Sequence, residues 1–232
     1  MIELAEGVHA LGSGKGGHVR AFLIENGTEL TLVDTLFDDD AHLVLEAIRS
    51  LGRSPSDLKR IGITHAHRSH LGGLAALKRA SGATVSSHPW EADIIAGQRR
   101  AQPVTLLPKG PPKLLPFRIG LRFNRPRHTP YAPDETLEPG GALGPLHALD
   151  AAGHSPGHLA FHWPERDFLI AGDAIATWPS LGPGWPAFHL NEAQHAESLR
   201  RLAALNARIV GVGHGDPITD NAADRVHSLA AV

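Results

Sequence analysis

Short apolar stretches, many of them β-branched, alternate along the chain with longer segments in which apolar residues recur every three or four positions. The longer segments, 39–51, 71–80, 91–98 and 191–205, have the spacing of amphipathic helices. The short stretches have the length and composition of strands, and they fall at 21–24, 30–33, 61–63, 83–85, 146–149, 159–161, 168–170 and 208–212. Because strands and helices alternate, the pattern predicts an α/β layered domain.

The composition is that of an ordinary globular protein, with 42% hydrophobic and 20% charged residues. No apolar run approaches the roughly 20 residues that a membrane-spanning helix needs. The 22 Lys and Arg nearly balance the 24 Asp and Glu, so the net charge indicates neither a nucleic acid nor a membrane as partner. We expect one domain over residues 1–232 and a small-molecule partner. We also expect a cytoplasmic location, because the first residues do not resemble a secretory signal. The oligomeric state is left open.

The chain has no cysteine but 16 histidines. Without cysteine there is no disulfide, no thiolate zinc ligand and no cysteine nucleophile. Imidazole is a good ligand for zinc, iron and similar metals. Any metal site must therefore use nitrogen and oxygen ligands.

Two irregular segments contain the candidate substrate contacts. Ten of the eighteen prolines fall between Pro103 and Pro145, which predicts a long loop that includes the only tyrosine, Tyr131. A second loop, 177–190, carries Trp178, Trp185 and Phe188. Aromatic side chains on irregular loops are typical of a pocket rim, so these four residues are the candidate substrate contacts. Packing within the loops is the alternative.

The densest chemical signal is a run of three histidines, His65, His67 and His70, directly after the predicted strand 61–63. Residues two apart in an extended chain point the same way, so His65 and His67 present their imidazoles together. His70, at the turn into a helix, can return toward the same point. Three histidines within six residues at a strand end indicate a metal site.

Three further candidate ligands, His154, Asp173 and His214, each follow a glycine near the end of a predicted strand. Glycine permits the tight turns that let side chains from different strands converge on one point. We therefore expect all of these residues at one edge of the sheets, where α/β layers keep their sites.

These segments resemble, in order, the motifs of the metallo-β-lactamase superfamily, whose signature is His-x-His-x-Asp-His followed by separate His, Asp and His ligands. The resemblance implies an αββα sandwich with a metal site along one edge. It also implies that His65, His67 and His154 hold one metal, that His70 and His214 hold a second, and that Asp173 bridges the two. Asp34 matches an early aspartate of the family that supports the histidine loop through hydrogen bonds. His88, His147, His158 and His162 are interpreted as structural.

Ser69 departs from the family pattern, because it stands where the family has an aspartate that ligates the second metal. Its neutral hydroxyl is a poor substitute for a carboxylate beside two dications. We therefore expect Ser69 beside the site without a ligand role, a weakened second position, and one or two bound ions. Zinc is the expected metal, with iron or manganese as alternatives.

The resemblance implies a metallo-hydrolase in which metal-bound hydroxide attacks a carbonyl and Asp173 is the catalytic group that accepts or relays a proton. Without a cysteine ligand, the chain resembles the thioesterases, lactonases and related hydrolases that use only His and Asp ligands more than the cysteine-containing β-lactamases, and we favour a lactone or ester over a β-lactam as substrate. Only 18 residues follow His214, with no counterpart of the helical domain that holds glutathione in glyoxalase II, so we expect no glutathione thioester as substrate.

Three alternatives stay open at this point. One is an oxidoreductase resembling persulfide dioxygenase, with a single iron held by two histidines and an aspartate. Another is a β-lactam hydrolase. The last is a binding module that keeps the pocket without turnover. Metal identity and turnover separate these alternatives.

Overall fold

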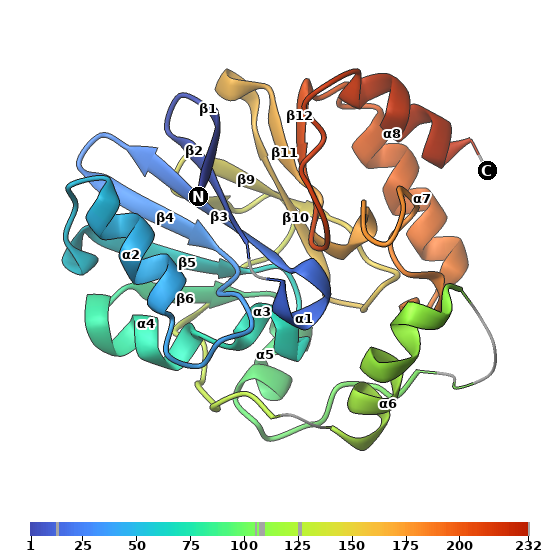
Figure 1. Ribbon diagram of the computed structural model, residues 1–232, viewed down its shortest axis with the longest axis horizontal. Helices are drawn as coiled ribbons and strands as arrows, with labels where there is room; N and C mark the ends of the chain where they lie inside the picture. Colours follow the sequence, from blue (N-terminus) through green and yellow to red (C-terminus); the bar gives the residue numbers. More distant parts are fainter. Residues whose placement is uncertain (13, 105, 107–109, 125–126, 232) are drawn as a thin grey trace.

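The computed structural model describes residues 1–12, 14–104, 106, 110–124 and 127–231. Two β-sheets lie in the middle of the molecule with helices on their outer sides (Figure 1). The first sheet has its strands in chain order, namely β1 (Ile2–Ala5), β2 (Val8–Gly12), β3 (Arg20–Asn26), β4 (Glu29–Val33), β5 (Leu58–Ile63), β6 (Thr84–Ser87) and β7 (Glu135–Thr136). The second has the order β12 (Ile209–Gly211), β11 (Phe168–Ile170), β10 (Leu159–Trp163), β9 (Leu146–Asp150) and β8 (Ala142–Leu143).

The helices form the outer layers. In Figure 1, α2 and α4 flank the first sheet, and α7 and α8 flank the second on the opposite side. The bounds are α1 (Lys15–His18), α2 (His42–Ser50), α3 (Arg68–Leu71), α4 (Leu74–Ser81), α5 (Pro89–Ile95), α6 (Leu115–Phe123), α7 (Glu192–Ala203) and α8 (Ala222–Ala230). No helix in the described ranges has the length and hydropathy needed to cross a bilayer.

The layering follows from the alternation of side chains along each strand. In β3, Ala21 and Leu23 belong to the apolar cluster beneath the helices, whereas Phe22 and Ile24 belong to the cluster between the sheets. Successive residues of a strand point to opposite faces, so a strand that is apolar at every position is buried on both sides. The second sheet repeats the pattern: β10 and β11 place Phe161 and Phe168 between the sheets and residues such as Leu169 against α7 and α8.

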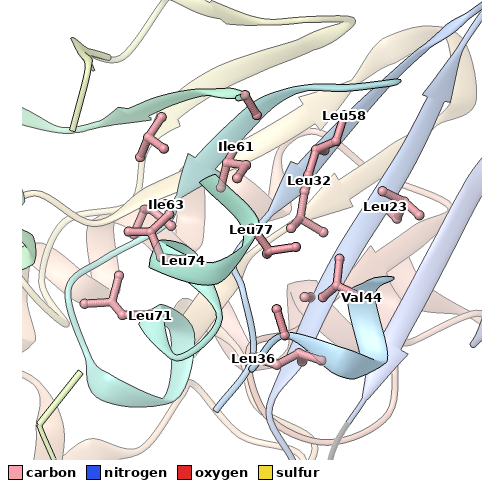
Figure 2. Close-up of a cluster of buried hydrophobic side chains, with 14 of the residues drawn as sticks. Leu23, Leu32, Leu36, Val44, Leu58, Ile61, Ile63, Leu71, Leu74 and Leu77 are labelled. Carbon is pink, nitrogen blue, oxygen red and sulfur yellow. The ribbon is translucent and has the colours of Figure 1, made fainter. Parts of the chain in front are cut away.

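Figure 2 shows the cluster between the first sheet and its helices. Leu23 and Leu32 of the sheet lie near Val44 of α2, and Ile63 lies near Leu74 of α4. These side chains are fully buried, and their packing fixes the strand ends from which the histidine loop leaves.

The predicted αββα sandwich is confirmed, and all eight predicted strands and four predicted helices are present, most of them with shifted ends. Asn191 caps α7, since its side-chain oxygen accepts a hydrogen bond from the Gln194 amide at 3.1 Å. The hydrophobic pattern does not predict the hairpin of β1 and β2, the helix α8 or the short strands β7 and β8.

The prediction of a structureless loop between Pro103 and Pro145 is wrong for the described part of that segment, because it contains α6. The physical reason is the position of the prolines. Pro116 lies in the first turn of α6, where its missing N–H costs no helical hydrogen bond and its fixed φ suits a helix. Residues 105, 107–109, 125 and 126 of the predicted loop lie outside the described residues.

Candidate metal centre

Six candidate ligands converge at one edge of the sandwich, because each lies just beyond the carboxyl end of a strand. His65 and His67 follow β5, and His70 lies in the short α3. His154 follows β9, Asp173 follows β11 in a single 3-10 turn (Gly172–Ala174), and His214 follows β12. They form two groups that share Asp173: His65, His67, His154 and Asp173, then His70, Asp173 and His214.

In the first group the ring nitrogens surround a common point. His67 Nδ1 lies 3.0 Å from both His65 Nε2 and His154 Nε2. Asp173 Oδ2 lies 3.3 Å from His154 Nε2 and 3.6 Å from His65 Nε2. Three imidazole nitrogens and one carboxylate oxygen in this arrangement are a ligand set suited to zinc or a similar cation.

The second group has one ligand fewer. His70 Nε2 lies 3.3 Å from Asp173 Oδ1, and His214 Nε2 lies 3.3 Å from Asp173 Oδ2. Ser69 lies beside them, half-buried and facing the same cavity, but it is not among the ligand groups found in the described residues. Asp173 is therefore the only carboxylate of this group, and it is shared with the first.

The electrostatics favour neutral histidines and a charged aspartate at the first position. Burial lowers the pKa of His67 to about 4 and holds the pKa values of His65 and His154 well below their usual range. Burial alone would raise the pKa of Asp173, but the charges of His214 and His70 outweigh it and hold that pKa well below its ordinary value. Neutral imidazole and carboxylate are the protonation states that bind a metal.

The surroundings of His70 favour a positive charge at the second position. Its Nδ1–H donates to Asp34 Oδ2 at 2.8 Å, and its Nε2 faces Asp173. Burial opposes the charged ring, yet Asp34 and Asp173 raise the pKa of His70 to about 10. Among the described residues, His70 Nε2 and Asp173 Oδ1 are buried without a hydrogen-bond partner. A cation between these two atoms would satisfy both, so the residues fit a metal ion.

Hydrogen bonds behind the ligands fix their orientation. The Thr64 hydroxyl donates to Asp34 Oδ2 at 2.8 Å and lies 3.0 Å from His65 Nδ1. His214 Nδ1 lies 2.9 Å from the Gly17 carbonyl. Asp34 therefore supports the histidine loop through both Thr64 and His70, and these contacts direct the Nε2 atoms of His65, His70 and His214 toward the centre.

A buried glutamate that the sequence analysis did not single out joins two of the ligand loops. Glu91 of α5 accepts hydrogen bonds from the Ala66 amide at 3.0 Å and the Ser155 hydroxyl at 2.5 Å. Burial raises its pKa, while hydrogen bonds from Ser155, Ala66 and Gly157 oppose that shift. Ala66 lies between His65 and His67, and Ser155 follows His154, so Glu91 ties together the loops that carry the first group.

The histidines interpreted as structural have backbone partners or lie outside the centre. His158 accepts a hydrogen bond from the Asp173 amide at 3.0 Å, and its Nδ1 lies 3.1 Å from the Ala151 carbonyl. His88 caps α5 through the Trp90 amide. His147 and His162 face each other across β9 and β10. His158 is thus a neighbour of the site that positions the backbone of Asp173.

The four aromatic residues predicted to contact a substrate differ in their position relative to the cavity. Trp185 and Phe188 line the cavity that contains His67, Asp173 and His214. Trp178 does not line it but packs behind Trp185, with ring centroids 5.8 Å apart. Tyr131 is not at the cavity. Its hydroxyl donates to Asp134 at 2.9 Å and its ring packs under Lys78, so the assignment of Tyr131 to substrate needs correction.

The chain is similar in sequence and in fold to known proteins. A model of the metallo-beta-lactamase superfamily matches residues 14–214. The hydroxyacylglutathione hydrolase of Rhodobacter capsulatus is 29% identical over 175 residues, which are 75% of this chain and 55% of that enzyme. The chain thus spans about half the length of that relative.

Two crystal structures show the same architecture. A metallo-beta-lactamase family protein of Thermus thermophilus has a TM-score of 0.69 and 28% identity, covering 99% of this chain and 80% of its own. TTHA1623 in a di-iron-bound form has a TM-score of 0.66 and 26% identity, covering 91% of this chain and 94% of its own.

Proposed function

We propose that this chain, which belongs to the metallo-β-lactamase superfamily, is a metal-dependent hydrolase of a small molecule with an ester, lactone or thioester carbonyl. The observation that carries the proposal is a cavity of about 540 Å³ onto which both ligand groups open through His67, Asp173 and His214. Trp185 and Phe188 supply an apolar wall for an acyl or lactone substrate. The hydroxyacylglutathione hydrolase of R. capsulatus supports hydrolysis as the reaction class.

A metal bound at such a centre polarises the carbonyl and acidifies a water molecule. The side chains of the protein would hold the metal, orient its ligands and transfer a proton. His65, His67 and His154 hold the first position, and Asp34, Thr64 and Glu91 keep those ligands oriented. Asp173 lines the cavity, and its Oδ1 has no hydrogen-bond partner among the described residues. Asp173 is therefore the group placed to accept a proton from water and pass it to the leaving group.

We also propose unequal metal positions, with zinc held firmly by the first group and weakly by the second. The first group has three histidines and Asp173, whereas the second shares that carboxylate and has Ser69 where an aspartate would add a charge. Fewer ligands and less negative charge weaken the binding of a dication.

Replacing Ser69 by aspartate is expected to raise the metal content from about one ion per chain toward two. The new carboxylate would enter the cavity beside His70 and His214. Elemental analysis after dialysis against a fixed free zinc concentration measures the change, and Ser69→Asn is the control that adds the same bulk without charge. Two tightly bound ions per chain with Ser69 in place would contradict the unequal positions.

The function itself is tested with the zinc-loaded protein on a panel of esters, lactones, thioesters and β-lactams. We expect turnover of esters, lactones or thioesters that is lost on chelation and recovered on adding zinc. A fully metallated protein that binds these compounds without turning over any of them would instead support a binding module. One iron per chain with oxygen consumption on a persulfide would support the dioxygenase alternative.

A further inference from the structure

Part of the wall of the cavity comes from a segment with an unusual charge. Residues 94–133 contain eight of the chain's 22 Lys and Arg and none of its 24 Asp and Glu. The near-zero net charge of the whole chain conceals this concentration. Figure 1 shows α6, the helix within this segment, in the lower part of the molecule, below α1 and α3. Such a concentration of one sign attracts anions toward the cavity that it borders.

Four arginines line the cavity: Arg68, Arg99, Arg100 and Arg127. Asp173 is the only acidic residue among the described residues of the lining. Since Asp173 belongs to both metal groups, a bound cation would neutralise it and leave the cavity strongly positive. A cationic cavity of this kind selects substrates with a negative charge.

Two of the four arginines already have bonded partners. Arg68 donates to Asp39 Oδ1 at 2.9 Å, to the Phe37 carbonyl at 2.5 Å and to the Arg127 carbonyl at 3.0 Å. Arg99 lies over the Trp90 ring, 4.0 Å from its centroid, and donates to the Trp90 carbonyl. These two guanidinium groups therefore shape the wall of the cavity.

Arg100 and Arg127 are available to bind a ligand. Within the described part of the chain, the guanidinium groups of Arg100 and Arg127 make no hydrogen bond or ion pair. Both residues are exposed, whereas Asp173 and His214, which line the same cavity, are buried. The Arg68 side chain holds the backbone carbonyl of Arg127, so the α3 helix that carries His70 also positions the loop with Arg127. The cavity thus runs from buried metal ligands to a mouth with two free guanidinium groups.

We infer that Arg100 and Arg127 form a subsite for a carboxylate at the end of the substrate remote from the scissile carbonyl. The inference rests on the proposed hydrolase function and names its substrate class: monoesters, monothioesters or lactones that carry a second, ionised carboxyl group. The planar guanidinium fork matches a carboxylate, and the aromatic wall of Trp185, Phe188 and Phe117 contacts the connecting carbon chain. Neutral acyl compounds lack the charged group that this mouth recognises.

The test compares two substrates of equal acyl length, 4-nitrophenyl hexanoate and the mono-4-nitrophenyl ester of adipic acid. We expect the natural chain to favour the adipate ester by at least about tenfold in kcat/KM, as one charge-assisted interaction would give. In the double variant R100Q/R127Q the preference should fall toward one, because kcat/KM for the adipate ester falls more than kcat/KM for the hexanoate. R122Q is the matched control, because Arg122 is exposed in the same segment on α6 and does not line the cavity. An equal preference in the double variant and the natural chain overturns the inference.

A binding measurement separates this inference from the hydrolase proposal, because it needs no turnover. Calorimetry compares the zinc-loaded protein's affinity for dicarboxylates from succinate to suberate with that for monocarboxylates of the same length. Both kinds can bind the metal through one carboxylate, so the difference reports the second. We expect at least one dicarboxylate to bind about tenfold tighter, with the advantage lost in R100Q/R127Q and kept in R122Q. Tighter binding of a dicarboxylate without hydrolysis of any substrate would support the carboxylate subsite and contradict the proposed hydrolase function. Hydrolysis without any dicarboxylate advantage would overturn the subsite alone.

Discussion

Replacing His154 by alanine is expected to lower kcat/KM at least about 10³-fold and to remove the firmly held metal. His154 Nε2 lies 3.0 Å from His67 Nδ1 and 3.3 Å from Asp173 Oδ2, so its loss opens the first ligand group on one side. A metal that polarises a carbonyl contributes several kcal/mol to the transition state, and each 1.36 kcal/mol is a factor of about ten in rate. Steady-state kinetics with elemental analysis of the same sample measures both effects.

His147→Ala is the matched control for this experiment. His147 lies on β9, the strand that leads to His154, but its side chain is exposed and outside both ligand groups. It should keep its metal and its rate. His154 also stacks on Phe188 with the ring centroids 6.4 Å apart, so thermal unfolding of each variant checks that the fold survives. If His154→Ala kept a full complement of metal and more than a tenth of the rate, the assigned first position would be wrong.

The convergence of the candidate metal ligands could be predicted because the sequence patterns that mark them are local. His65 and His67 share one face of an extended loop, and the glycines before His154, Asp173 and His214 mark strand ends. The carboxyl ends of β5, β9, β11 and β12 meet at one edge of the sandwich, so correct strand assignment brings the ligands together without further information. Asp34 was predictable for the same reason, since it follows β4 directly.

The surrounding groups were not predictable from the pattern, because their roles depend on how separate segments pack. In the sequence, Glu91 is indistinguishable from the exposed acidic residues that are common in the first turn of a helix. Only the fold shows that it is buried between the two loops that carry candidate ligands. Arg127 belongs to the proline-rich segment that the pattern predicts to be a long loop, and Arg100 lies between the predicted helix 91–98 and that segment. Tyr131 was assigned to substrate by residue type, but its bond to Asp134 places it elsewhere.

Replacing Gly213 by alanine is expected to reduce activity far more than stability. A Cβ at this position would lie 1.9 Å from Asp173 Oδ1 and 3.0 Å from the Gly172 carbonyl carbon. The backbone cannot easily retreat, because the Gly213 amide donates to the Gly172 carbonyl at 2.8 Å and its carbonyl accepts from the Arg20 amide at 2.9 Å. The Asp173 carboxylate must therefore move. Since it belongs to both ligand groups, we expect at least about a 10²-fold loss of kcat/KM, with about 1–3 kcal/mol lost from the free energy of unfolding.

Gly182→Ala is the control for this last variant. Gly182 lies in the loop that precedes Trp185, and the nearest heavy atoms to an added Cβ are 3.8 and 4.0 Å away, in ordinary van der Waals contact. Its backbone φ is not in the left-handed region, so alanine fits without strain. Metal content, kcat/KM and thermal unfolding are measured for both variants. A Gly213→Ala protein with full metal content and full activity would show that Asp173 is free to move without consequence. It could then be neither the shared ligand nor the proton acceptor, and the chemistry of the site would have to be assigned to other residues.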